Sequence, residues 1–314
     1  MIDCHVHLWD PADGHPWIRP ESPHYRAFTA DDLAASGADP VDPADEAADD
    51  PADGPVDGSA AAIDGAILVE ASRGDVGETD ALRRLWLDHP QIILGYVANL
   101  HLHADDGVGR FRDLLRELAE TRPHGMRLGG PQWEQTPEAA RALIPVLADE
   151  DVVLELNLGR DAVRVAADVA ARHPQLTVVV DHLGNPANLL TEDASGWRAD
   201  VAYAARHPNV VMKISGLLTQ QRGVPVEQVA DLARHAVAEF GPQRCLIGSD
   251  WPICLPAGTR TQSLRLAERG LAGLSAADRG SVLRGTAERV YQVASRARGL
   301  TTIEPLCFDS TDDR

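Results

Sequence analysis

The opening ten residues, MIDCHVHLWD, carry an Asp-x-His-x-His pattern. In a β-strand the side chains at positions i and i+2 lie on one face, so the spacing predicts that Asp3, His5 and His7 point together. Two converging imidazoles suit a borderline-soft divalent metal such as zinc. The alternative is a first strand whose histidines are satisfied by ordinary hydrogen bonds. The ends of the other strands decide between the two.

Polar residues also stand at the ends of later apolar, β-branched segments. They are Glu70, Arg127, Glu155, Asn157, Asp181, His182, Lys213, Ser215, Ser249 and Asp250. Taken alone, His182 or Asp250 would be interpreted as a core polar group whose hydrogen bonds are satisfied. Their joint occurrence at strand ends favours an active site.

Short apolar runs alternate with amphipathic segments of helical length from Asp64 onward, a pattern typical of repeated strand-helix units. Strands are predicted over residues 2–8, 65–71, 92–100, 124–130, 152–158, 177–183, 210–216 and 245–250. Helices are predicted over residues 78–88, 108–120, 137–150, 160–172, 193–206, 226–240, 261–271 and 276–293. The sequence therefore predicts the α/β class and a single (β/α)8 TIM barrel over residues 1–300, with 301–314 as a tail.

Several other histidines are expected to have no catalytic role. His89, His173 and His207 each precede a proline at the end of a predicted helix. Proline stops the helix and histidine suits the helix dipole, so a structural role at the strand-entry side is expected. His101 and His103 follow the third strand at the start of a loop and are expected to be exposed to solvent.

The composition argues against some classes of function. A net charge of -19 argues against nucleic-acid binding, which needs a basic surface. The four cysteines are scattered and predict neither a disulfide framework nor a cysteine zinc site. With no leader and no apolar run of membrane-spanning length, we expect a cytoplasmic protein that acts on a small molecule, and a homo-oligomer stays open.

The acidic excess is concentrated after the first strand. Residues 31–62 are rich in Asp, Pro, Ala and Gly and poor in aromatic and β-branched residues, so they are predicted to form a solvated, flexible insertion in the barrel. The 29 basic residues include a single lysine, Lys213, which the sequence alone attributes to a compositional preference for arginine.

A set of ordered motifs spans nearly the whole chain and resembles the amidohydrolase-related family (amidohydrolase family 2), especially its lactonase branch. The motifs are IDCHVHLWD, the ETD of residues 78–80, VVVDHLGNP, MKISG and LIGSDWP. The resemblance implies a TIM barrel that opens a lactone with water as the nucleophile. By motif, His182 matches the sixth-strand histidine. Asp250 matches the eighth-strand aspartate, the implied proton shuttle between the water and the leaving oxygen.

The resemblance also implies a metal site. His5 and His7 match the first-strand pair, and we predict one divalent ion, zinc, bound by these histidines and Asp250. Glu70 and His182 are further candidate ligands. The lactonase branch has both metal-using and metal-free forms, so a site without metal remains the alternative.

Substrate contacts are predicted from the fourth, fifth, seventh and eighth strands. Arg127 resembles the arginine that anchors a substrate carboxylate or carbonyl, and Asn157, Lys213 and Trp251 are expected beside it. Many superfamily members have a metal-ligating histidine and a bridging Lys or Glu where this chain has Asn157 and Arg127, so a two-metal centre is not expected. A non-oxidative decarboxylase of the same superfamily and a non-catalytic barrel that only binds a ligand are the alternative functions.

Overall fold

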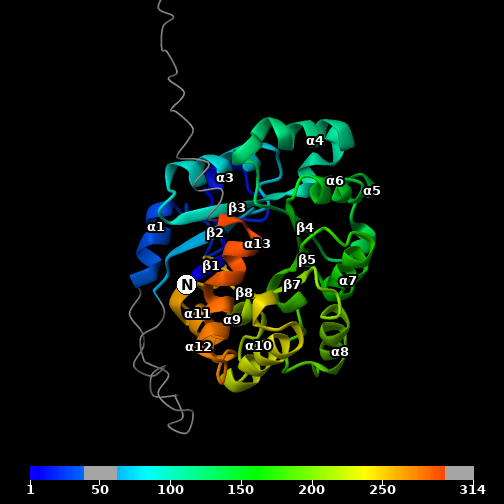
Figure 1. Ribbon diagram of the computed structural model, residues 1–314. Helices are drawn as coiled ribbons and strands as arrows, with labels where there is room; N and C mark the ends of the chain where they lie inside the picture. Colours follow the sequence, from blue (N-terminus) through cyan, green and yellow to red (C-terminus); the bar gives the residue numbers. More distant parts are fainter. Residues whose placement is uncertain (39–61, 294–314) are drawn as a thin grey trace, which may run out of the picture.

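The computed structural model describes residues 1–38 and 62–293, and its strands form one parallel sheet in the order β1 to β8 (Figure 1). The strands are β1 Ile2–Val6, β2 Gly65–Val69, β3 Ile93–Asn99, β4 Gly125–Gly130, β5 Val153–Leu158, β6 Val178–Val180, β7 Val210–Ile214 and β8 Cys245–Ile247. The sheet closes on itself just beyond β8, where His7 N donates to Trp251 O (2.8 Å) and Asp250 N donates to His5 O (2.9 Å). The predicted (β/α)8 barrel is confirmed.

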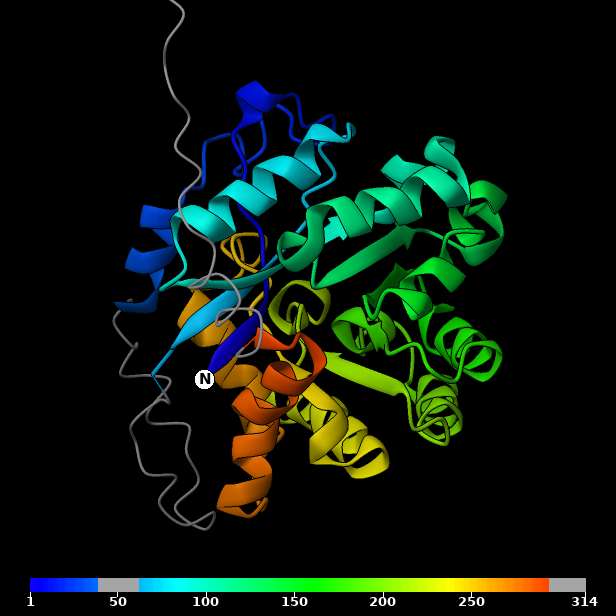
Figure 2. The same ribbon diagram turned by 45° about the horizontal axis from the view of Figure 1, so that its top comes forward.

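Helices surround the barrel (Figure 2). They are α1 Ala30–Ala35, α3 Gly77–Asp88, α4 Gly107–Leu118, α5 Glu138–Arg141, α6 Ile144–Asp149, α7 Ala162–Arg172, α8 Ser195–Ala204, α9 Leu217–Gln220, α10 Val226–Phe240, α11 Arg260–Arg269, α12 Ala276–Gly280 and α13 Thr286–Val290. The helix predicted over 137–150 is divided into α5 and α6. The helix predicted over 276–293 is divided by a π-helical turn between α12 and α13. None of the described helices is long and apolar enough to span a bilayer.

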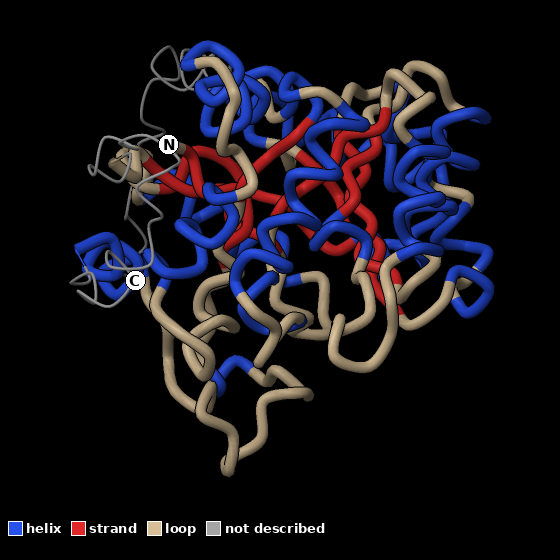
Figure 3. The backbone as a smooth tube through the Cα atoms, turned by 90° about the horizontal axis from the view of Figure 1, so that it is seen from below, coloured by secondary structure: helices blue, strands red, loops and turns tan. Residues whose placement is uncertain are grey.

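The last helix closes one end of the barrel. Ala287, Val290 and Tyr291 pack with interior residues of the strands, including Cys4 and Val153. In Figure 1 this helix lies in front of the strands, and in Figure 3 long loops project on the side away from the N-terminus. The open end of the barrel is therefore the end at which the parallel strands finish, where the chemistry of this fold is expected.

Part of the predicted acidic insertion is an ordered helix. Thr29 and Asp32 form a capping box at the start of α1. Leu33 is buried, and its carbonyl accepts a hydrogen bond from Arg260 Nη1 (3.2 Å). The segment after β1 thus packs on the barrel as far as residue 38. The remainder of the predicted insertion, residues 39–61, and the predicted tail lie outside the described residues.

The three His-Pro histidines lie at helix ends, as predicted. His89 and His173 directly follow α3 and α7, and each backbone N–H donates to the preceding turn. His207 follows α8, and its N–H donates to Ala204 O (3.0 Å). All three are partly exposed, which agrees with a structural role.

Candidate active site

The first strand turns two histidines into the barrel but not Asp3. The pairing of β1 with β2 shifts register between Asp3 and Val6. Asp3 points toward α11, where its carboxylate accepts hydrogen bonds from the N–H of Ser249 (2.8 Å), the hydroxyl of Ser249 (2.6 Å) and Nε of Arg260 (2.8 Å). The expectation that Asp3 shares a face with the histidines was wrong, because the irregularity breaks the alternation on which it relied.

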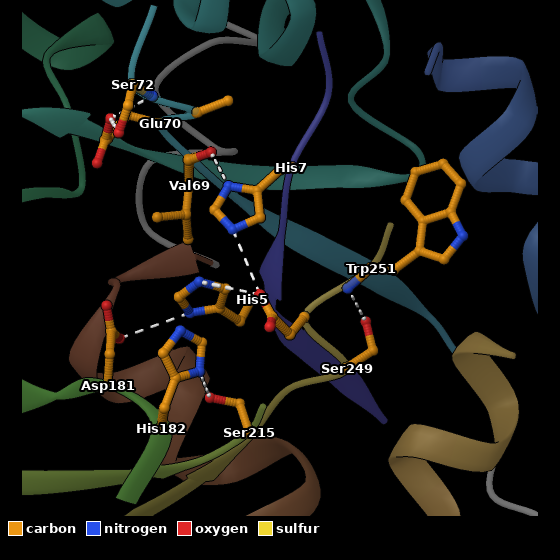
Figure 4. A network of polar contacts seen from close by, with 12 residues as sticks. His5, His7, Val69, Glu70, Ser72, Asp181, His182, Ser215, Ser249 and Trp251 are labelled. Atoms are coloured by element: carbon orange, nitrogen blue, oxygen red, sulfur yellow. Dashed lines mark hydrogen bonds and ion pairs between the residues drawn. The ribbon is translucent and has the colours of Figure 1, made fainter. Parts of the chain in front are cut away.

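Three imidazoles converge at the open end of the barrel (Figure 4). The ring of His5 lies 4.9 Å from that of His7 and 4.3 Å from that of His182, measured between centroids. His182 comes from the turn Asp181–Gly184 that follows β6, and its backbone has a φ of 53°. A left-handed conformation costs free energy in a non-glycine residue, and such residues concentrate at functional sites.

Asp250 lies next to two of these histidines. Its Oδ1 is 3.5 Å from Nε2 of His7 and 3.8 Å from Nε2 of His5. The residue has a φ of 62°, and β8 approaches β1 so closely before it that a Cβ on Gly248 would lie 2.7 Å from Cβ of His5. Glycine at position 248 is therefore needed to bring the carboxylate beside the first-strand histidines.

The hydrogen bonds of the histidines define what can lie between them. His7 Nδ1 contacts the carbonyl of Val69 at 2.9 Å, and a carbonyl can only accept, so Nδ1 carries the hydrogen. In neutral His7 the lone pair of Nε2 then faces Asp250. Nε2 of His5 is buried and has no hydrogen-bond partner among the described residues. Lone pairs directed at a carboxylate require a proton or a metal cation between them.

These atoms fit a divalent metal. The ligand atoms of His5, His7 and Asp250 all lie within 4.8 Å of one another. Ligands bound at about 2.0–2.2 Å in a tetrahedral arrangement are separated by roughly 3.3–3.6 Å, close to the observed 3.5 and 3.8 Å. The predicted ligand set therefore has the right chemistry and spacing, and a water molecule could take a further position.

A second group of charges lies directly behind His5. Nζ of Lys213 is 2.7 Å from Oε2 of Glu155 and 2.8 Å from Oδ1 of Asp181. We call Lys213, Glu155 and Asp181 the interior ion cluster. All three side chains are fully buried, and the hydroxyl of Tyr291 donates to the other oxygen of Glu155. Lys213 was expected to contact substrate, but its ammonium group is paired with Glu155 and Asp181 inside the barrel.

Arg127 is also engaged before any substrate arrives. Its Nε donates to Oε1 of Glu70 (2.6 Å), and its Nη2 donates to the carbonyl of the same residue (3.0 Å). Glu70 in turn accepts from Asn99 Nδ2 (3.0 Å) and from the N–H of Ser72 (2.7 Å). Glu70 is thus held by Arg127 and Asn99, so it is not a candidate metal ligand in this arrangement.

The buried charges at this end of the barrel do not balance. Six buried charged groups are joined to the histidines or to one another by ion pairs, namely the carboxylates of Glu70, Glu155, Asp181 and Asp250 and the cations of Lys213 and Arg127. With all six ionised the net charge is -2 (four negative, two positive). Burial raises the pKa of Glu155 to about 7, so a proton can relieve part of this excess. A single divalent ion would balance these six groups, and Glu78, a further buried carboxylate beside Glu70 whose pKa burial raises to about 7, can carry a proton.

Asp250 is an ionised carboxylate in this setting. Burial alone would raise its pKa, but His182, His7 and His5 together lower the pKa of Asp250 to about 2. His182 is held by a contact of 2.9 Å between its Nδ1 and the hydroxyl of Ser215, and burial lowers its pKa. The site therefore presents a charged proton acceptor, Asp250, beside His5 and His182, whose pKa values are lowered by burial.

The other predicted substrate residues lie at the edge of the site. Asn157 accepts a hydrogen bond from Asn185 Nδ2 (3.1 Å), and Asn185 Oδ1 accepts from Gln220 Nε2 (2.6 Å). The sequence interpretation did not include Asn185 and Gln220. The position of Asn185, directly after the DHLG turn, was the available signal. Trp251 is buried, and its ring packs edge-on against the ring of Phe28. It therefore helps to form the wall of the site and does not present a surface to the substrate.

The second His-x-His pair is not exposed, and this prediction was wrong. His103 is buried, and its ring contacts Oγ1 of Thr79 (3.3 Å) and Oδ2 of Asp106 (3.0 Å). Nε2 of His101 lies 2.8 Å from the carbonyl of Gly129. The segment Leu100–Asp106 forms a 3-10 helix that packs on α3. Its polar sequence gives no sign of this packing.

Comparison with known proteins agrees with this architecture. The family model described as amidohydrolase matches residues 2–293. A curated L-fucono-1,5-lactonase of Burkholderia multivorans is 40% identical over 141 residues, which is 40% of this chain and 47% of that protein. A protein of the same name from Burkholderia ambifaria is 31% identical over 138 residues, 44% of this chain and 47% of that protein. The chain thus spans about half the length of the curated relatives it matches.

A solved structure extends the likeness to the whole barrel. The crystal structure of an amidohydrolase from Burkholderia multivorans with bound zinc is 26% identical and superposes with a TM-score of 0.74. The superposition covers 93% of this chain and 98% of that one. With the family match over nearly all described residues, these findings show that the chain belongs to the amidohydrolase family.

Proposed function

We propose that the protein hydrolyses a lactone, with Asp250 accepting the proton of the attacking water and returning it to the ring oxygen that leaves. The observation that supports this most directly is the position of the Asp250 carboxylate, 3.5 Å from Nε2 of His7 at the open end of the barrel. A pKa of about 2 keeps this group ionised at neutral pH, so it can accept a proton.

One divalent ion, zinc, is proposed as the cofactor. His5, His7 and Asp250 would hold it, and the excess of buried carboxylates over buried cations around the histidines favours a divalent cation. When bound, such an ion lowers the pKa of water and polarises a carbonyl. His7 keeps its Nε2 directed at this position, because its Nδ1 is anchored to the carbonyl of Val69.

The substrate is proposed to be an uncharged sugar-acid lactone. A substrate carboxylate would need a cation, but Arg127 is already paired with Glu70, and Lys213 is closed off in the interior ion cluster. A neutral polyhydroxylated ring would instead find amide groups at the rim, on Asn157 and Asn185. A six-membered deoxyaldono-lactone is the first candidate, in line with the name of the Burkholderia relatives.

The same charge pattern disfavours the decarboxylase alternative. A decarboxylase must hold the carboxylate that leaves as carbon dioxide, and the buried cations Arg127 and Lys213 are occupied by carboxylates of the protein. A barrel that only binds a ligand has no need of an ionised Asp250 held in a left-handed conformation.

The test is a panel of neutral and carboxylated lactones, assayed by the release of acid with a pH indicator. We expect turnover of 1,5-lactones of sugar acids and none of pyrone dicarboxylates. The matched control is Asp10→Asn, an exposed carboxylate near the first strand, which should leave the rate unchanged. Release of carbon dioxide from an aromatic acid, or no turnover with any lactone, would overturn the proposal.

A further inference from the structure

Lys213 is the only lysine in the chain, and it is fully buried. The sequence has 29 basic residues, and the other 28 are arginines. Lys213 lies on β7 with no exposed surface. An ammonium group is a compact charge with three donors, whereas a guanidinium is a wide planar fork. We infer that position 213 requires a small cation, which arginine cannot supply.

The surroundings of this ammonium group are those of a metal ion. Nζ of Lys213 lies 2.7 Å from Glu155 Oε2 and 2.8 Å from Asp181 Oδ1. It also lies 3.4 Å from Nδ1 of His5. His5, Glu155 and Asp181 themselves form a group whose ligand atoms lie within 4.8 Å of one another, the second such group among the described residues.

We propose that Lys213 is a built-in cation that occupies a second metal position, so that the barrel holds a divalent ion only between His5, His7 and Asp250. The proposal rests on the proposed function for the ion at the open end of the barrel. It goes beyond that function by assigning a role to the interior ion cluster. In this role Lys213, and not a metal ion, neutralises the buried carboxylates of Glu155 and Asp181.

The same contacts position His5. Asp181 Oδ1 lies 3.5 Å from Nδ1 of His5 and is drawn to Lys213 from the other side. A carboxylate behind an imidazole favours the hydrogen on the near nitrogen and leaves the far nitrogen free to bind a cation. In the unaltered protein Nδ1 of His5 therefore carries a hydrogen, and it can become a ligand of the second position only when Lys213 is absent and that proton is released. Lys213 is therefore a positioning residue, which acts on the metal site through Asp181.

The experiment removes the cation in a chain whose first site is disabled. In His7→Ala, bound zinc should fall well below one equivalent. In His7→Ala/Lys213→Ala the vacated space should bind zinc again, to roughly one equivalent per chain. The matched control is His7→Ala/Lys213→Met, in which a neutral side chain of similar length fills the space and no zinc is regained.

A further variant tests whether the regained ion uses the cluster. Adding Glu155→Gln to His7→Ala/Lys213→Ala should abolish the gain, because one of the two carboxylates is lost. Zinc is measured by elemental analysis after dialysis, and folding by circular dichroism. If His7→Ala/Lys213→Ala is folded and binds no more zinc than His7→Ala, the proposal is overturned. Folding of that variant only when zinc is added would support it.

A measurement on the unaltered protein decides the case if the variants do not fold. Because the chain has one lysine, labelling with nitrogen-15 at Nζ gives one lysine side-chain signal. An ammonium group whose protons exchange slowly with water supports the proposal, and a neutral amine overturns it. Failure of lactone turnover would count against the proposed function alone, since neither zinc content nor this signal depends on a substrate.

Discussion

Nε of Arg127 donates to Oε1 of Glu70 across 2.6 Å, and both side chains are buried. Arg127→Met should therefore act first on stability, because it leaves the Glu70 carboxylate buried without its cation. We expect a loss of about 3 kcal/mol in the free energy of unfolding, measured with urea. Adding Glu70→Gln should restore at least about 1 kcal/mol. Arg112→Met, which breaks a surface pair with Asp149, is the control and should cost less than about 1 kcal/mol.

Asp250→Asn should abolish turnover without unfolding the protein. Asparagine tolerates the left-handed backbone at this position, but its amide cannot accept the proton of water. The expected loss in kcat is about 100-fold or more. A folded variant that keeps more than roughly a tenth of the rate would remove Asp250 from the proton-transfer step.

Asp3→Asn should lower the stability of the protein without affecting metal binding, the second role of the first strand. Asp3 binds Ser249 and Arg260 on the outer side of β1, so its neutralisation should cost about 2–4 kcal/mol of stability. The zinc content should not change. Loss of zinc with full stability would place Asp3 among the ligands and overturn its assignment to the outer side of β1.

Removal of the metal should lower stability more at pH 8 than at pH 6. The ion balances buried negative charge, and at the lower pH Glu155, whose pKa burial raises to about 7, can take up a proton instead. Ligation stabilises by about 3 kcal/mol when the free ion is roughly 100 times its dissociation constant. Thermal unfolding with and without chelator measures the difference. Asp250→Asn, which lacks one charged ligand, should respond less to chelator.

Glu78 gives a pH dependence of stability away from the metal. Its carboxylate accepts hydrogen bonds from the N–H groups of Ala71 and Arg73, and burial, with the nearby charge of Glu70, raises its pKa from 4.5 to about 7. A group whose pKa is raised on folding stabilises the protein most below its unfolded pKa, and this contribution is lost as the pH rises through the folded pKa. The stability that Glu78 contributes should therefore decline between pH 4.5 and pH 7.

The comparison variant is Glu78→Gln, which stays neutral. The stability of the unaltered protein relative to this variant should fall by up to about 3 kcal/mol between pH 5 and pH 8. Urea unfolding of both proteins at the two pH values gives the difference directly. An equal difference at both values would show that Glu78 does not titrate in this range.

The barrel could be predicted from sequence because its determinants are local. From Asp64 onward the apolar runs that form the strands are each followed by an amphipathic segment of helical length. Helix α1 escaped prediction although Thr29 and Asp32 form a local capping box, because its packing depends on distant groups, among them Arg260, which donates to the carbonyl of Leu33. Its own sequence is acidic and resembles the segment that follows it.

The candidate site could be predicted in part for the same reason. His5 and His7 are separated by one residue, and their convergence is a property of one strand. The pairing of Arg127 with Glu70 joins residues 57 positions apart, and the enclosure of Lys213 joins three strand ends and a helix. Whether a polar side chain serves the substrate or another side chain depends on these distant partners, and spacing along the chain does not report them.

The hydroxyl of Tyr291 donates to Glu155, and Glu155 lies beside Lys213, which contacts His5. The first strand, the middle of the chain and the last described helix therefore meet in one continuous chain of contacts. During synthesis on the ribosome His5 emerges early, but it has to wait until α13 has left the exit tunnel before its surroundings are complete. A fragment that ends before Tyr291 therefore lacks one contact of the interior ion cluster, and we expect the surroundings of His5 to be incomplete in it.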